Sequence, residues 1–255
     1  MKIETVSILN SKIARMTMRE VLEWVRMMID QRKPRQIVTA NAEILYSGFK
    51  NKDHRSLLDR VDLITADGIG AVLASRIAGR PVPERVAGID LAQELFVLAE
   101  EKSWKIYFLG AAEEVVQKAV LNVLSKHTRL NICGYQHGYF TEEERDSVAL
   151  KIREAEPHIL LVAMGFPQQE LFIQEQLKAM QVPVSIGVGG SFDVMAGTAR
   201  RAPAWMRRIG FEWLYRLIEQ PSRAGRMLNL PRFIIAVIME KYLHKTALFG
   251  RKKGK

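Results

Sequence analysis

Acidic and small residues stand together directly after one short apolar run of this sequence. Asp67 comes two positions after the run at residues 62–65, and Gly68 and Gly70 follow it, so little bulk separates its carboxylate from a ligand. A carboxylate in such a place can take a proton from an attacking hydroxyl group. The same position is equally typical of an N-cap for a helix beginning at Ile69. The spacing alone leaves both roles open.

A second polar turn holds Thr39 and Asn41, which close the apolar run at residues 36–39. A hydroxyl group and an amide there can orient a polyhydroxylated ligand. Both residue types are also favoured helix caps, and on spacing alone capping is the commoner role.

A stiff loop with two prolines spans residues 80–90 and carries two cations, Arg80 and Arg85. Their planar guanidinium groups pair well with phosphate oxygens, so both are candidate anion binders. The loop ends in Asp90, which we expect to cap a helix over residues 91–102.

Glycine turns close three further apolar runs, at residues 105–109, 158–163 and 184–188. Backbone amides where such a turn enters a helix can bind phosphate. Polar side chains that can hydrogen-bond the base or ribose of a nucleotide follow two of the turns. The candidates for substrate binding are Gly110, Gly165, Gln169, Glu170, Gly189 and Asp193.

Several common catalytic patterns are missing. The sequence has no GxGxxG or GxxxxGK[ST] loop, no GxSxG elbow and no Asp-x-Asp, and its five histidines lack metal-ligand spacing. We therefore expect neither a metal nor a cofactor, and we expect arginines to neutralise any leaving diphosphate. Arg216, Arg223 and Arg226 are candidates, although a solvated basic face is the usual explanation of such charges.

Six apolar runs alternate with helix-like stretches up to about residue 195. This rhythm is typical of a mostly parallel sheet covered by helices on both faces, a Rossmann-like α/β fold. Ligands of such folds bind outside the carboxyl ends of the strands, where the turns described above should meet. The runs lie at residues 36–39, 62–65, 105–109, 130–133, 158–163 and 184–188.

Positive charge is concentrated in the last 56 of the 255 residues, which hold 14 Lys and Arg against three acids. Large apolar residues interleave with these charges, and helical patterns cover residues 204–219, 222–228 and 231–248. Such a segment suits an anionic membrane surface. No apolar run approaches the roughly 18 residues of a spanning helix. We expect a catalytic domain at residues 1–195 and a membrane-associating helical appendage at residues 196–255.

Two other classes of protein compete with a membrane-bound enzyme. A pI near 9.8 permits a nucleic-acid-binding protein, but the tail's charges lie among large aliphatic residues rather than in a low-complexity arm. An enzyme that modifies soluble nucleotide sugars would usually need the missing dinucleotide fingerprint. The single cysteine, Cys133, fits a cytoplasmic protein, and the sequence leaves a homo-oligomer open.

Taken in order over about residues 30–232, the turns resemble those of the WecG/TagA/CpsF glycosyltransferases, glycosyltransferase family 26. The combination of motifs is more specific than any one of them. The matching segments are TANAE at 39–43, ADGIG at 66–70, RVAGID at 85–90, FLG at 108–110, GYF at 138–140, VAMGFPQQE at 162–170, GVGGSFD at 187–193, RAPxW at 201–205 and EWLYRL at 212–217.

The resemblance implies an inverting transfer of a sugar from a UDP donor to an undecaprenyl-diphosphate-linked acceptor at the inner face of the cell membrane. The TagA branch is the most similar; it implies UDP-N-acetylmannosamine as donor and the 4-OH of lipid-linked N-acetylglucosamine as acceptor, a step of wall teichoic acid synthesis. Related motifs serve other hexoses, so the donor sugar stays open. The resemblance makes Asp67 the base, Thr39 and Asn41 orienting residues, Arg85 and Gln169 pocket residues, and Arg216, Arg223 and Arg226 diphosphate contacts.

Overall fold

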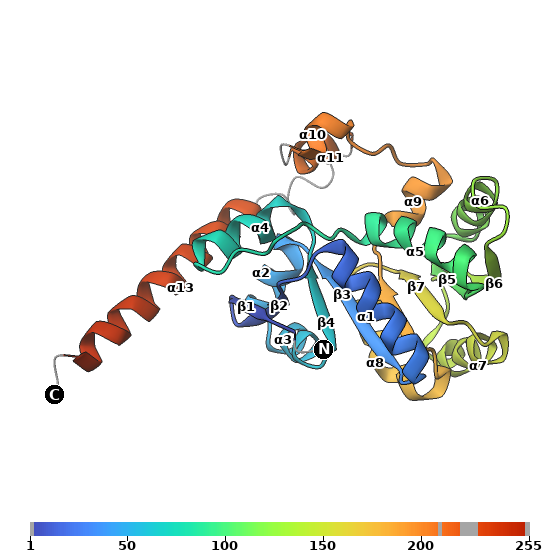
Figure 1. The fold of residues 1–255 in the computed structure, drawn as a ribbon, viewed down its shortest axis with the longest axis horizontal. Helices are drawn as coiled ribbons and strands as arrows, with labels where there is room; N and C mark the ends of the chain where they lie inside the picture. Colours follow the sequence, from blue (N-terminus) through green and yellow to red (C-terminus); the bar gives the residue numbers. More distant parts are fainter. Residues whose placement is uncertain (1–2, 209–210, 220–228, 253–255) are drawn as a thin grey trace.

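The centre of the protein is a six-stranded sheet in which all neighbouring strands are parallel, in the order β4-β3-β8-β7-β5-β6. Figure 1 shows the computed structural model, which describes residues 3–208, 211–219 and 229–252. All six predicted apolar runs are strands of this sheet, and the predicted fold class is confirmed. The strands are β3 Arg35–Ala40, β4 Leu63–Ala66, β5 Lys105–Gly110, β6 Asn131–Gln136, β7 Ile159–Ala163 and β8 Val184–Gly187.

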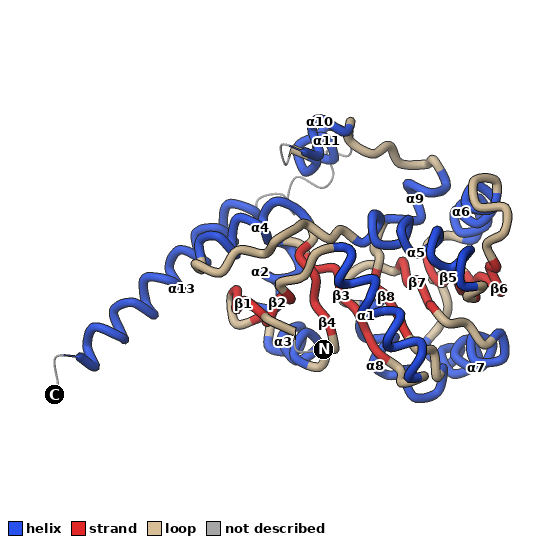
Figure 2. The backbone as a smooth tube through the Cα atoms, viewed as in Figure 1, coloured by secondary structure: helices blue, strands red, loops and turns tan. Residues whose placement is uncertain are grey.

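The central strands are mostly apolar and are buried because helices cover both of their faces. Every residue of β7 and of β8 is buried. One face packs against α1 Met18–Gln31, α5 Gly88–Lys102, α6 Glu113–Leu124 and α9 Ser191–Ala196. The other face packs against α2 Ala42–Lys50, α3 Lys52–Asp59, α4 Gly68–Ile77, α7 Arg145–Ala155 and α8 Gln168–Met180, and the short 3-10 helix η1 Glu142–Glu144 precedes α7. Figure 2 shows the red strands of the sheet surrounded by blue helices.

An N-terminal hairpin, which the sequence analysis did not predict, packs beside the sheet on the α2 and α4 side. Its strands are β1 Thr5–Ile8 and β2 Ser11–Ala14, paired antiparallel. Leu9 and Asn10 form its turn, both with positive φ. The strands are only four residues long, which is why their alternation is a weak signal.

The C-terminal part is helical where it is described, as predicted. It contains α10 Ala204–Arg208, α11 Glu212–Glu219 and the long α13 Asn229–Lys252, while the predicted helix at residues 222–228 lies outside the described residues. In Figure 1, α13 extends away from the sheet as an arm. The first turns of this arm are nevertheless part of the body, because Phe233 and Val237 are buried in the core cluster that contains α2 and α4.

Two carboxylate hydrogen bonds join α13 to the N-terminal hairpin. Glu240 accepts from the backbone N–H groups of Leu9 and Asn10, at 2.9 and 3.1 Å. Over the part of the chain that the structure describes, no helix is both long and apolar enough to cross a membrane. The boundary at residue 195 stays a prediction.

Candidate functional site

The predicted site residues gather at the carboxyl edge of the sheet. β7 and β8 are neighbours, but α8 follows β7 on one face and α9 follows β8 on the other. Helices that leave in opposite directions open the sheet edge between the two strands, and ligands bind at such places in parallel sheets. The turns after β3 and β4 complete the edge, which places Asn41 and Asp67 on the same side of the molecule.

Asp67 lies where two helices begin. It occupies the N-cap position of α4 without making a side-chain capping bond, and its Oδ2 accepts a long hydrogen bond of 3.4 Å from the N–H of Gly88, the first residue of α5. The N-terminus of a helix is an electropositive setting that favours a negative side chain. The backbone N–H of Asp67 donates to Ala40 at 2.9 Å, which fixes the residue against β3. The side chain is therefore held at the edge without serving as a helix cap.

Thr39 and Asn41 both make structural hydrogen bonds. Asn41 is the N-cap of α2, with its Oδ1 accepting from the N–H of Ile44 at 3.0 Å. The buried hydroxyl group of Thr39 donates to the carbonyl of Gly187 at 3.1 Å and so joins β3 to β8. A Cβ at Gly88 would lie 2.8 Å from this hydroxyl oxygen, so α5 begins in direct contact with Thr39.

Arg85 belongs to a loop that runs along β4, the strand that ends directly before Asp67. Thr65 donates to the carbonyl of Val86, and the N–H of Val86 donates to Ala66 at 2.9 Å. The guanidinium group of Arg85 donates to Asp90 at 2.9 Å and to Glu212 of α11 at 3.0 Å. The expected role of Asp90 is therefore wrong. Asp90 lies in the first turn of α5, whose N-cap is Ala87.

Asp90 instead belongs to a cluster of four charges that joins the sheet domain to α11. Arg201 lies 2.7 Å from Asp90 and 4.0 Å from Glu212, so that each arginine contacts both acids. All four side chains are largely buried. We call Arg85, Asp90, Arg201 and Glu212 the charge cluster.

Gln169 joins two glycine turns by hydrogen bonds. Its Oε1 accepts from the N–H of Gly165 at 3.2 Å and from the N–H of Gly189 at 3.1 Å, and its Nε2 donates to Glu170 at 2.7 Å. The backbone N–H groups of Gly165 and Gly189 therefore already have a hydrogen-bond acceptor within the protein. Glu170 has no exposed surface, which argues against the expected direct contact with the substrate. Burial raises the pKa of Glu170 to about 7.

The glycines of the site are needed for different structural reasons. A side chain at Gly110 would overlap the backbone of Ala163, so this glycine allows β5 and β7 to approach closely. A side chain at Gly68, Gly165 or Gly189 would meet open space, so packing does not require glycine there. Their backbone does, because each of the three has a positive φ. These three turns therefore present bare backbone at the edge of the sheet.

The remaining predicted residues are placed in part. Asp193 lies in the first turn of α9, and its carboxylate lies near Gly190. Arg216 is on α11, but only its backbone is described. Arg223 and Arg226 lie outside the described residues. Among the residues that are described, no three His, Cys, Asp or Glu side chains are grouped to hold a metal ion.

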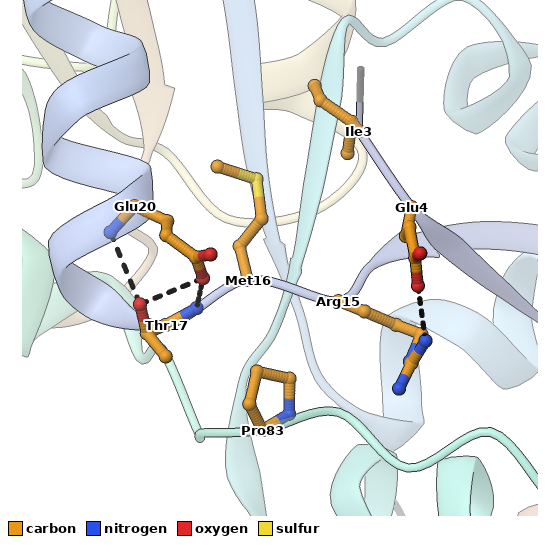
Figure 3. Close-up of a pocket in the computed structure, with 7 residues that line it drawn as sticks. All are labelled: Ile3, Glu4, Arg15, Met16, Thr17, Glu20 and Pro83. Atoms are coloured by element: carbon orange, nitrogen blue, oxygen red, sulfur yellow. Dashed lines mark hydrogen bonds and ion pairs between the residues drawn. The ribbon is translucent and has the colours of Figure 1, made fainter. Parts of the chain in front are cut away.

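A surface pocket of about 420 Å³ lies elsewhere, between the N-terminal hairpin and the start of α1. Figure 3 shows Arg15 paired with Glu4 there, and the capping box of Thr17 and Glu20 that begins α1. Neither this pocket nor a second one beside Trp24 and Arg35 contains a predicted site residue. The turns that hold the predicted site residues lie instead at the carboxyl edge of the sheet.

Comparison with known proteins decides the family. A family model described as glycosyl transferase WecG/TagA/CpsF family matches residues 6–247. The chain belongs to the WecG/TagA/CpsF glycosyltransferase family.

Two similar relatives carry the name N-acetylglucosaminyldiphosphoundecaprenol N-acetyl-beta-D-mannosaminyltransferase. The protein of Bacillus subtilis (strain 168) is 39% identical over 218 residues, which cover 86% of this chain and 84% of the relative. The protein of Staphylococcus aureus (strain MW2) is 34% identical over 211 residues, covering 83% of this chain and 82% of the relative. The predicted class of enzyme, a glycosyltransferase, is confirmed.

Sequence reasoning on this glycosyltransferase missed two members of the charge cluster. Arg201 and Glu212 stand within motifs that carried the family resemblance, but neither was given a role. No local pattern pairs them with Arg85 and Asp90, because the contacts cross more than 100 residues. In the sequence, Arg201 and Glu212 are each a single charged residue beside apolar residues. This pattern is also typical of a solvated helix face, so it did not point to a buried contact.

Proposed function

We propose that this glycosyltransferase transfers N-acetylmannosamine from UDP-N-acetylmannosamine to the 4-OH of undecaprenyl-diphosphate-linked N-acetylglucosamine, with inversion at the anomeric carbon. The names of the relatives support the donor sugar and the acceptor. The observation that carries the mechanism is the position of Asp67, a carboxylate at the carboxyl edge of the sheet, between the first residues of two helices.

In a single displacement, Asp67 takes the proton of the acceptor hydroxyl group as its oxygen attacks the anomeric carbon. The bond from that carbon to the diphosphate breaks, and UDP leaves with the electron pair. Thr39 lies near the end of the neighbouring strand β3 and Asn41 follows that strand, and their fixed side chains shape the surface on which the sugars are oriented. Most of the rate acceleration then comes from positioning and from electrostatic stabilisation.

The departing diphosphate carries negative charge that cations must offset. Arg85 lies in the loop that runs along β4 and contacts Glu212 of α11, and Arg216 follows Glu212 by one helical turn. We assign both, with Arg223 and Arg226, to the diphosphate groups, because guanidinium groups pair bidentately with phosphate oxygens. The bare turns at Gly165 and Gly189, with Asp193 beside the second, receive the nucleoside.

We place the enzyme on the inner face of the cell membrane, with α13 as its contact. Four large apolar side chains of α13 are exposed, with accessible fractions between 38% and 66%: Ile235, Ile238, Met239 and Tyr242. Their spacing puts them on one side of the helix, away from the buried Phe233 and Val237. A helix with this apolar stripe and a strongly basic end suits an anionic bilayer.

A donor panel tests the reaction. The enzyme is given UDP-N-acetylmannosamine, UDP-N-acetylglucosamine or UDP-glucose with a lipid-diphosphate N-acetylglucosamine acceptor, and released UDP and glycosylated lipid are measured. We expect both products with UDP-N-acetylmannosamine alone. Transfer from another donor would replace the sugar in this assignment, and release of UDP without glycosylated lipid would refute the acceptor.

A further inference from the structure

The first turn of α8 contains a carboxylic acid that touches no solvent. Glu170 is completely buried, and its Oε1 accepts the hydrogen bond from Nε2 of Gln169 at 2.7 Å. Its Oε2 is also buried and has no hydrogen-bond partner among the described residues. A buried acid so poorly satisfied destabilises a fold unless it serves another purpose.

The partners of Gln169 give Glu170 that purpose. The amide group of Gln169 has an oxygen that accepts and a nitrogen that only donates. Its oxygen accepts from Gly165 and Gly189, one residue on each side of the opening between β7 and β8. If the amide were turned over, its nitrogen would face two N–H donors, and both glycine amides would lose their partner.

Glu170 decides between these two orientations. Oε1 of Glu170 can accept a hydrogen bond from the Gln169 nitrogen. If the amide turned so that its oxygen faced Glu170, a hydrogen bond could form only if Oε1 carried a proton. The pair is packed tightly under β8, because a Cβ at Gly187 would lie 2.8 Å from Oε1 of Glu170 and would also overlap the Gln169 amide.

Charged groups do not explain the acid. Burial and hydrogen bonds to Gln169 and to its own backbone are the causes of the Glu170 pKa shift, with no charge among them. On the elements that pack against α8, charged and titratable side chains are engaged with other partners: Arg35 with Asp62, Arg55 with Asp59, His54 with Ser47, Asp146 with Gln176, and Arg145 with Glu175.

We propose that Glu170 is a positioning residue: it orients the amide of Gln169, and through it sets the two glycine turns that receive the donor nucleotide. This inference rests on the proposed function for the identity of the ligand, but the positioning itself does not. Glu170 acts from beneath the site and contacts no substrate. The Gly165 and Gly189 amides report its action directly.

The experiment measures hydrogen exchange of the Gly165 and Gly189 amide protons by NMR, and the binding of UDP, in the full chain. Glu170→Leu removes the acceptor for Gln169. We expect both amides to exchange about tenfold faster and UDP to bind about tenfold more weakly, the loss of one net hydrogen bond. Glu170→Gln keeps a carbonyl oxygen at the same place and restores both quantities.

A matched control separates positioning from general loss of stability. Gln174 lies on the same helix and donates to Gln36 and to the carbonyl of Leu57. We expect Gln174→Leu to lower stability without changing UDP binding. The Leu161 amide in β7 reports global opening, and the exchange rates of the Gly165 and Gly189 amides relative to it should stay as in wild type. Gln169→Ala reproduces the effects of Glu170→Leu.

The outcomes are distinct. Unchanged exchange at Gly165 and Gly189 in folded Glu170→Leu overturns the positioning role, as does a failure of Glu170→Gln to restore slow exchange. Faster exchange without any change in UDP affinity supports the positioning role, and counts instead against the proposed location of the donor. Should Glu170→Leu not fold, Gln169→Ala and Glu170→Gln decide the question by the same two measurements.

Discussion

Arg85 and Glu212 are joined by a hydrogen bond of 3.0 Å although 127 positions separate them in the chain. Arg85 comes from the loop beside β4, and Glu212 begins α11. The bond therefore joins α11 to the loop that runs along β4, the strand that ends directly before Asp67. Because Asp90 and Arg201 complete an alternating set of charges, loss of one acid leaves two arginines sharing a single carboxylate.

The first prediction concerns this contact. Glu212→Gln removes a charge from largely buried partners, so α11 should separate from the sheet domain more often. We expect amide hydrogen exchange of Glu212–Glu219 to become about tenfold faster, equivalent to ~1.4 kcal/mol. Mass spectrometry of exchanged peptides measures this. Glu23→Gln, in the exposed pair with Arg19, is the control and should change nothing. Equal exchange in the two variants would show that the charge cluster does not hold α11.

A second prediction tests Asp67 as the base. Asp67→Asn keeps an oxygen that can accept from Gly88, so the fold should remain stable, while transfer should fall by about 100-fold to 10,000-fold. Turnover and the unfolding midpoint are measured together. Wild-type turnover in this variant would remove Asp67 from the mechanism.

The control for this variant is another aspartate of the same strand region. Asp62 lies at the opposite end of β4, where it accepts from Arg35 and from the N–H of Gln36. Asp62→Asn should lower stability but keep transfer, the reverse of the effect at Asp67.

A third prediction separates glycines that the fold requires from glycines that face a ligand. Gly165→Ala puts a methyl group into open space at a positive φ, which costs about 1 kcal/mol of stability and should also weaken UDP binding. Gly79→Ala has the same kind of φ and the same open space at the far end of α4, so it should show the strain without the loss of binding. Unfolding by urea and UDP titration give the two values. Equal UDP affinity in both variants would mean that the turn at Gly165 is not part of the donor site.

A fourth prediction follows from the pKa of Glu170, which burial raises from 4.5 to about 7. Between these values the folded chain keeps a proton that the unfolded chain has released, so this group's contribution to stability falls as pH rises. Between pH 5 and pH 8, we expect wild type to lose about 2 kcal/mol relative to Glu170→Gln. Urea unfolding of both proteins at the two pH values provides the comparison. Parallel pH profiles would show that the acid is not held neutral.

The sequence predicted the sheet well because its signals are local. Each central strand is a short apolar run closed by a glycine or polar turn, as in β7 before Gly165, and parallel pairing then brings the turns to one edge. Glu170 shows where such reasoning fails. It stands one position after Gln169 in a polar stretch that looks exposed, yet the first turn of α8 points both side chains under β8. Which side of a helix faces inward at its first turn depends on packing, and no spacing rule gives it.

The last prediction concerns the apolar stripe of α13. Ile238→Glu combined with Met239→Glu puts two charges on the exposed side of the helix, while Phe233 and Val237 keep their buried contacts with the body. If the stripe enters the bilayer, binding to vesicles with anionic lipids should fall at least about tenfold, since each buried apolar side chain contributes on the order of 1.5–3 kcal/mol. Vesicle sedimentation measures the bound fraction.

Leu121→Glu, at an exposed leucine of α6, is the matched control and should bind as wild type does. Because α13 is joined to the N-terminal hairpin through Glu240, the double variant should retain the wild-type unfolding midpoint. Unaltered vesicle binding in a folded double variant would move the membrane contact to another part of the protein.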